Sequence, residues 1–141
     1  MRYYSDFQRL NYKRTIDAYG RWLEQHPWDT YNHLTFAYNS ISPEGESRMI
    51  DKSVSPEGAK RMFEEAIKEL GERIIYFRAI EWFPQRVNVH IHCLIGNCQE
   101  KINWKHGIYK IEPYDPQQGA RFYLAKLCLS DRADLDYKLC L

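Results

Sequence analysis

The 141-residue chain lacks the features that mark secreted, membrane-spanning or disulfide-stabilised proteins. No apolar run approaches the roughly 20 residues that a bilayer-spanning helix needs. The segment Met1–Asp6 carries no apolar signal-peptide core. The four cysteines form no CxxC pair, so free thiols are expected rather than a disulfide framework. These absences predict an intracellular, cytoplasmic protein with no membrane contact.

Net charge is nearly absent as well, at +1, and the sequence has no P-loop, internal repeat or low-complexity tract. A neutral total neither favours nor excludes a nucleic-acid partner, because a local basic groove can bind phosphate on a neutral protein. The chain does contain 44% hydrophobic and 28% charged residues, the composition of a folded protein. We expect one domain, residues 1–141, with its core over about residues 30–130.

Hydrophobic periodicity and turn residues predict a mixture of helices and strands. The expected elements are a helix over 6–25 with Ser5 as N-cap, a strand over 30–38, an irregular loop to Val54, a helix over 55–70 ended by Gly71, strands over 73–82 and 87–95, a short strand over 107–111 and a helix over 117–129. Because helices and strands do not alternate regularly, the predicted class is α+β. We expect a central antiparallel sheet, ferredoxin-like or RRM-like, with flanking helices.

Two histidines lie on the second strand of the predicted hairpin, in Val89-His90-Ile91-His92-Cys93. Alternation along a strand sends His90 and His92 to one face and the other three residues to the opposite face. Neutral imidazoles are common ligands of divalent metal ions, and a rigid strand fixes the spacing between two of them. The pattern predicts a metal site, with a merely polar strand face as the plainer alternative.

Glu81 is the expected third ligand. If the hairpin closes tightly on Gln85-Arg86, Glu81 lies directly across from His90 on the same face, and its carboxylate favours Mn²⁺ or Mg²⁺. A one-residue bulge near Pro84 would reverse this placement. The rival third ligands are Asp29, Asn32, His33 and Asn88.

A zinc site that draws on Cys93 and Cys98 is a further alternative. Strand alternation points Cys93 away from both histidines, and the spacing matches no structural zinc pattern. The cysteines are therefore the weaker candidates.

The last predicted helix contains Tyr123-Leu124-Ala125-Lys126. Residues three apart share a helix face, so the Lys126 ammonium could stabilise negative charge on the Tyr123 phenol or on a phosphate. In the plainer alternative Tyr123 is a core residue. The Tyr-x-x-Lys motif is more specific when it follows a strand that carries His-x-His, as it does here.

Taken in order, these motifs resemble the HUH superfamily of endonucleases, in particular the rolling-circle replication initiators (Rep proteins) of plasmids, phages and small DNA viruses. The strand His33-Leu34-Thr35-Phe36 is similar to the family's opening strand. His90-Ile91-His92 is similar to its histidine motif, and Tyr123-Leu124-Ala125-Lys126 to its tyrosine motif. The turn Trp104-Lys105-His106-Gly107 is similar to the turn before the strand that precedes the family's tyrosine helix. The resemblance covers about residues 31–129.

The resemblance implies site-specific nicking of single-stranded DNA, in which Tyr123 attacks a phosphodiester and leaves a 5′-phosphotyrosine and a free 3′-hydroxyl. Lys126 and a Mn²⁺ or Mg²⁺ ion held by His90, His92 and Glu81 would assist. The substrate would be single-stranded DNA at a replication origin, with a hairpin as one form that it could take. A helicase would come from the host or from a separate chain, and a virus or plasmid product would work inside the host cell.

Candidate DNA-contacting cations are Arg78, Arg86, Lys105 and Lys110, with Trp82 and Trp104 as candidate base-stacking aromatics. Two other functions stay open. A single-tyrosine HUH transposase of the insertion-sequence type has similar chemistry, although its tyrosine usually lies farther beyond the histidines. A non-catalytic nucleic-acid-binding domain would use His90 and His92 only to line its groove. The sequence does not specify the origin or the oligomeric state.

Overall fold

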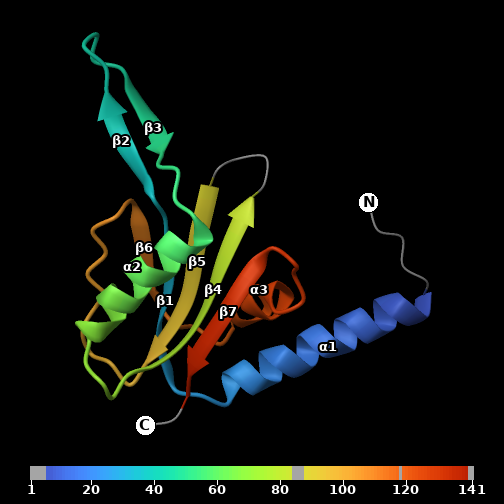
Figure 1. Cartoon of the computed structure of the whole chain (residues 1–141). Coiled ribbons are helices and arrows are strands. Elements are labelled where there is room, and N and C mark those ends of the chain that lie inside the picture. The colour runs from blue at the N-terminus through green and yellow to red at the C-terminus, as the bar shows by residue number, and fades with distance from the viewer. Residues whose placement is uncertain (1–5, 84–87, 118, 140–141) are drawn as a thin grey trace.

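The computed structural model describes residues 6–83, 88–117 and 119–139 of the chain. Its helices and strands are α1 (Asp6–Glu24), β1 (Trp28–Leu34), β2 (Ala37–Ile41), β3 (Ser47–Asp51), α2 (Pro56–Lys68), β4 (Ile75–Phe83), β5 (Asn88–Gly96), β6 (Tyr109–Pro113), α3 (Ala120–Leu127) and β7 (Ala133–Lys138). A five-stranded antiparallel sheet carries helices on both sides (Figure 1), which confirms the predicted α+β class.

The central sheet has the strand order β6-β1-β5-β4-β7, with every neighbouring pair antiparallel. β1 and β4 both pair with β5, so they run parallel to each other and are joined through α2 as a split βαβ unit. The order β6-β1-β5-β4 is that of a ferredoxin-like sheet, although a loop rather than a helix joins β5 to β6. The histidine strand β5 is the middle strand, with β1 and β4 on either side.

Two hydrophobic cores lie on the two faces of the sheet, and different helices cover them (Figure 1). On one face Phe63 of α2 packs with Ile80 and Ile91 of the sheet. On the other face Leu124 of α3 and the C-terminal part of α1 pack with Phe77. Because side chains alternate along a strand, successive residues of β4 or β5 face α2 and the α1–α3 pair in turn.

The helix predicted from Ser55 forms as its sequence indicates. The Ser55 hydroxyl accepts a hydrogen bond from the Gly58 backbone N–H at 3.0 Å, and Pro56 begins α2. Ser55 thus provides an acceptor for a backbone N–H that has no partner within the helix, and the ring of Pro56 fixes the backbone in a conformation that suits the first helical turn. Gly71, with φ of 101°, follows the helix in the left-handed region, where glycine carries no Cβ penalty.

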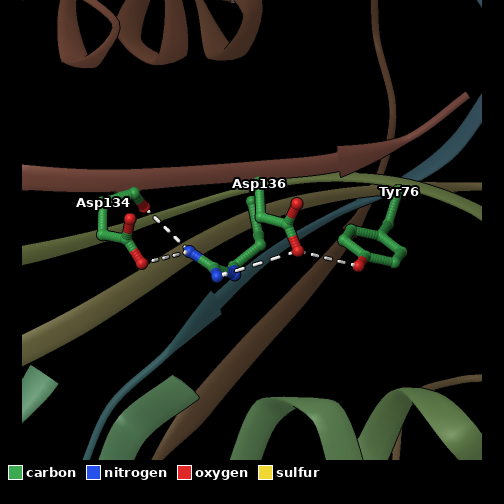
Figure 2. Close-up of polar contacts among 4 residues, drawn as sticks. Tyr76, Asp134 and Asp136 are labelled. Atoms are coloured by element: carbon green, nitrogen blue, oxygen red, sulfur yellow. Dashed lines mark hydrogen bonds and ion pairs between the residues drawn. The ribbon is translucent and has the colours of Figure 1, made fainter. Parts of the chain in front are cut away.

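A charged network joins the edge strand β7 to the sheet (Figure 2). Arg78 of β4 lies beneath α2, is 1% exposed, and donates from Nη1 to the backbone oxygen of Asp134 at 2.9 Å and to its Oδ2 at 3.2 Å. Nη2 lies 3.9 Å from Oδ2 of Asp136, which also accepts a hydrogen bond from the Tyr76 hydroxyl. Both carboxylates are about half exposed and compensate the buried cation.

The structure corrects the expected strand over 30–38 and the loop after it. β1 ends at Leu34, and β2 begins at Ala37 in a separate two-stranded sheet with β3. The backbone N–H and hydroxyl of Thr35 both donate to the Ile108 carbonyl, while Trp104 Nε1 donates to the Thr35 carbonyl. These long-range contacts turn the chain outward, and the β2–β3 hairpin projects from the body (Figure 1).

Three smaller differences concern the C-terminal third. The strand expected over 107–111 lies at 109–113, and α3 is shorter than the expected helix over 117–129. The sequence pattern does not predict β7, because charged Asp134 and Asp136 stand at the positions that face Arg78. Ser5 and the expected hairpin turn at residues 85 and 86 lie outside the described residues. No helix in the described part is long and apolar enough to cross a bilayer.

Candidate metal centre and tyrosine nucleophile

β5 places both histidines on the sheet face that α3 covers. Glu81 is directly opposite His90 in the β4–β5 ladder, and His33 is directly opposite His92 in the β1–β5 ladder. The predicted pairing of Glu81 with His90 is therefore confirmed. The predicted segregation of faces is confirmed too, because Val89, Ile91 and Cys93 lie in the core beneath α2.

Three histidines cluster on this face. The ligand nitrogens of His33, His90 and His92 all lie within 4.8 Å of one another, close enough to hold one metal ion. His33 Nε2 is 3.2 Å from His90 Nδ1, and the rings of His33 and His92 stack with centroids 4.7 Å apart. His92 is 5% exposed.

Glu81 links this cluster to α3. Its Oε1 lies 3.3 Å from His92 Nε2 and accepts a hydrogen bond of 3.2 Å from the Tyr123 hydroxyl. The Tyr123 ring also meets the His92 ring edge-on, with centroids 4.9 Å apart. The tyrosine and histidine motifs, which are more than thirty residues apart in the chain, therefore meet at one carboxylate oxygen.

α3 presents Tyr123 to the cluster because its other face is anchored in the core. Leu124 and Leu127 are buried against the sheet, and the Tyr123 backbone N–H donates to the Gly119 carbonyl in the first turn. Tyr123 itself is 41% exposed, so its ring borders the cluster while remaining accessible to a substrate. Lys126, one turn later, is exposed.

The three histidines are held in their neutral form. Burial, together with the proximity of His33 and His90, lowers the pKa of His92 to about 3. Burial is also the main cause that lowers the pKa of His33 and of His90. The contact between His92 Nε2 and Glu81 Oε1 is therefore not an ion pair of a charged imidazolium. Neutral imidazole is the form that ligates metal ions.

Two phenols lie at the site with raised pKa values. Burial, the charge of Glu81 and the hydrogen bond to Glu81 together raise the pKa of Tyr123 to about 12. Burial, with the charges of Glu112 and Glu81, raises the pKa of Tyr31 to about 12. Without added positive charge, both hydroxyls stay protonated at neutral pH.

Tyr31 is a site residue that the sequence reasoning missed. Its hydroxyl lies 3.0 Å from His92 Nδ1, and its ring is roughly parallel to the imidazole. The available signal was its position two residues before His33 in a predicted strand, which places both side chains on one face. His33 appeared only as a rival ligand, and the structure brings it into the cluster.

Two donor sets can be drawn for a divalent metal. The ligand atoms of His33, His90 and His92 all lie within 4.8 Å of one another. The second set replaces His33 with Glu81, whose Oε1 lies 3.3 Å from His92 Nε2. Neighbouring ligands of an octahedral ion at about 2.1 Å lie about 3 Å apart, close to the 3.3 Å between His92 Nε2 and Glu81 Oε1. We favour the second set, because a carboxylate suits Mn²⁺ or Mg²⁺ and because Glu81 also contacts Tyr123.

Other predicted ligands lie elsewhere. Asn32 is buried on the α2 face, where Nδ2 donates to Thr30 and to the Cys93 carbonyl. Asp29 accepts from the Cys98 backbone N–H at the far end of β1. The Asn88 side chain lies outside the described part. Cys93 is fully buried on the α2 face, so the structure does not bring it to the histidines.

The predicted DNA-contacting cations separate in space. Lys110 is directly opposite His33 on the edge strand β6, is 73% exposed, and pairs with Glu112 at 2.6 Å. Lys105 is exposed in the turn before β6. The expectation for Arg78 is corrected, because this side chain is buried on the opposite face and paired with Asp134. Arg86 lies outside the described residues.

The two predicted stacking aromatics do not border the cluster either. Trp104 is buried, with its Nε1 bonded to the Thr35 carbonyl, and Trp82 packs against the core beneath α2. A cavity of about 370 Å³ does lie beside the site, lined by Tyr31, Glu112, Pro113, Asp115 and Ala120. A larger hollow, about 720 Å³, is lined by α1, β4, β7 and Cys128 and does not touch the histidines.

Comparison with known proteins gives no relative. The chain matches no family model, no curated protein and no solved structure.

Proposed function

We propose that this chain is a metal-dependent, site-specific endonuclease of single-stranded DNA that cleaves by attack of Tyr123 on a phosphodiester. The single observation that carries the proposal is the contact chain from the Tyr123 hydroxyl to Glu81 Oε1 to His92 Nε2, with distances of 3.2 and 3.3 Å. It joins an accessible phenol to a set of metal ligands. The resemblance to Rep proteins makes initiation of rolling-circle replication the biological role.

The reaction balances without an external cofactor that is consumed. The Tyr123 oxygen forms a bond to phosphorus, and the bond from phosphorus to the 3′-oxygen breaks. The phenolic proton leaves, and the departing 3′-oxygen gains a proton, which gives a 5′-phosphotyrosine and a free 3′-hydroxyl. One ester replaces another, so the link stays reversible and can be resealed.

The chain's own groups position and activate the nucleophile. Glu81 accepts the hydrogen bond of the Tyr123 hydroxyl and so orients its oxygen toward the cluster face. Lys126 follows Tyr123 by one helical turn, and Lys110 stands opposite His33; both exposed ammonium groups can bind phosphate oxygens. A Mn²⁺ or Mg²⁺ ion on His90, His92 and Glu81 would polarise the scissile phosphate as a Lewis acid.

The direct test is covalent capture. The purified chain is incubated with a pool of single-stranded oligonucleotides and Mn²⁺, and a protein–DNA adduct is sought on a denaturing gel. Tyr123→Phe should form no adduct. Tyr137→Phe is the matched control, because Tyr137 packs against Trp22 and Phe77 away from the histidines. Peptide mapping of the adduct must identify Tyr123 and not Tyr31.

The outcome of the same experiment separates the alternatives. An adduct that persists in Tyr123→Phe rejects the assigned nucleophile. Metal-independent binding without cleavage favours a non-catalytic nucleic-acid-binding domain. Origin-containing replicon DNA and transposon-end hairpins, offered in parallel, distinguish a replication initiator from a transposase.

A further inference from the structure

We propose that Tyr31 and His33 are positioning residues that fix the tautomers of His92 and His90, so that both histidines present Nε2 to one divalent cation. The inference deepens the proposed function and rests on its metal site. It gives a role to β1, which supplies no ligand if the ion is bound by His90, His92 and Glu81.

The two contacts have the same form. The Tyr31 hydroxyl lies 3.0 Å from His92 Nδ1, and His33 Nε2 lies 3.2 Å from His90 Nδ1. In both cases a side chain of β1 engages Nδ1 of a histidine on β5. The nitrogen left over is Nε2, and in His92 this atom is the one that faces Glu81 Oε1.

The strand register explains why the contacts repeat. Tyr31 is directly opposite Leu94 and reaches diagonally to His92, two residues back along β5. His33 is directly opposite His92 and reaches by the same diagonal step to His90. Diagonal neighbours on one sheet face lie within reach of long and aromatic side chains. Tyr31 and His33 are two residues apart on β1, as His90 and His92 are on β5, so the pairs Tyr31–His92 and His33–His90 have equivalent geometry.

The chemistry requires such partners. A neutral imidazole carries one N–H, so a histidine that ligates through Nε2 must hold its proton on Nδ1 and needs an acceptor there. The Tyr31 oxygen can accept from His92 Nδ1, and His33 Nε2 can accept from His90 Nδ1. For the second bond, His33 keeps its own proton on Nδ1 and is itself not a ligand.

The competing arrangement uses His33 as the third ligand. In that arrangement His33 Nε2 and His90 Nδ1 both face the ion, and Glu81 is not needed. The ion would then be bound without the carboxylate that contacts Tyr123. The two arrangements predict opposite tautomers for His90, so they can be distinguished without any measurement of cleavage.

The test reads tautomers and metal affinity directly. Long-range ¹⁵N–¹H NMR of the Mg²⁺-loaded protein should show Nδ1–H on both His90 and His92. Affinity for Mn²⁺, measured by electron paramagnetic resonance of the free ion, should fall about 10–100-fold in Tyr31→Phe and in His33→Ala. His33→Gln, whose side-chain carbonyl can accept the same hydrogen bond, should restore most of the loss. Tyr109→Phe, on the neighbouring strand, is the matched control.

Three results would overturn the inference: Nε2–H on either histidine of the loaded protein, unchanged affinity in Tyr31→Phe, or a loss in His33→Ala that His33→Gln does not recover. The last result would make His33 a ligand. Circular dichroism checks that each variant folds, and the wild-type NMR result stands if one does not. Absence of a covalent DNA adduct with intact metal binding would reject the proposed function alone.

Discussion

At the scale of single residues, the site keeps the hydroxyl of Tyr123, the proposed nucleophile, protonated unless positive charge is added. A phenol with a pKa of about 12 is ionised in roughly one molecule in 10⁵ at pH 7. Burial and Glu81 both raise the pKa of Tyr123, so neither of them favours the phenolate. The charge that favours phenolate must come from Lys126, from the metal, or from both.

Lys126→Met should slow covalent adduct formation by about 10²-fold, because it removes a cation that can stabilise the phenolate and the phosphate. Single-turnover gel assays with saturating oligonucleotide and Mn²⁺ measure the rate. Lys126→Arg keeps the charge and should retain much of the activity. Equal defects in both variants would show that charge is not what Lys126 contributes, while Mn²⁺ affinity should be unchanged in each.

At the scale of elements, the edge strand β7 depends on one buried cation. Asp134→Ala should lower the free energy of unfolding by about 2 kcal/mol, less than the 3–5 kcal/mol typical of a broken buried pair, because Asp136 stays within 3.9 Å of Arg78. Urea unfolding measures the change. Arg78→Met should cost less, since it leaves two half-exposed carboxylates in water. The opposite ranking would contradict this account.

The β2–β3 hairpin should be dispensable for the fold and for metal binding. Its side chains Ile41 and Met49 are 74% and 62% exposed, and Ala37 pairs with Asp51 at its base. Replacing residues 38–50 with Asn-Gly, a two-residue turn that suits such a pair, should change the free energy of unfolding by less than about 1 kcal/mol. Mn²⁺ affinity should not change. A large loss in either quantity would assign the hairpin a role in the body of the protein.

Local pattern predicted those elements whose signals are local. α2 has its cap, its first-turn proline and its apolar spacing in one continuous segment, and the opposition of Glu81 to His90 follows from a simple hairpin register. β2 and β7 could not be predicted in this way. β2 exists because Thr35 is held by residues near position 108, and β7 is fixed by Arg78, more than fifty residues away.

At the scale of the whole molecule, the candidate site is assembled from four elements that the sheet brings together. Strand alternation predicts the His90 and His92 pair, and the tyrosine motif predicts Tyr123. The roles of Tyr31 and His33 depend on how β1 pairs with β5, some sixty residues later, and a single sequence does not encode that register locally. The sequence therefore reveals the candidate ligands and nucleophile but not the residues that orient them.

Because the favoured ligands come from both β4 and β5, the metal should stabilise the fold and not only the site. A ligand that binds only the native state adds about 2.7 kcal/mol to the free energy of unfolding at 100 times its Kd. For a chain of this size that corresponds to a rise in Tm of roughly 10 °C. Calorimetry with Mn²⁺ in excess, and again after chelation, measures the shift. His90→Ala should unfold at the same temperature with and without Mn²⁺, and Glu81→Ala should lose most of the shift. If Glu81→Ala keeps the full shift while His33→Ala abolishes it, the ion is bound by the three histidines instead.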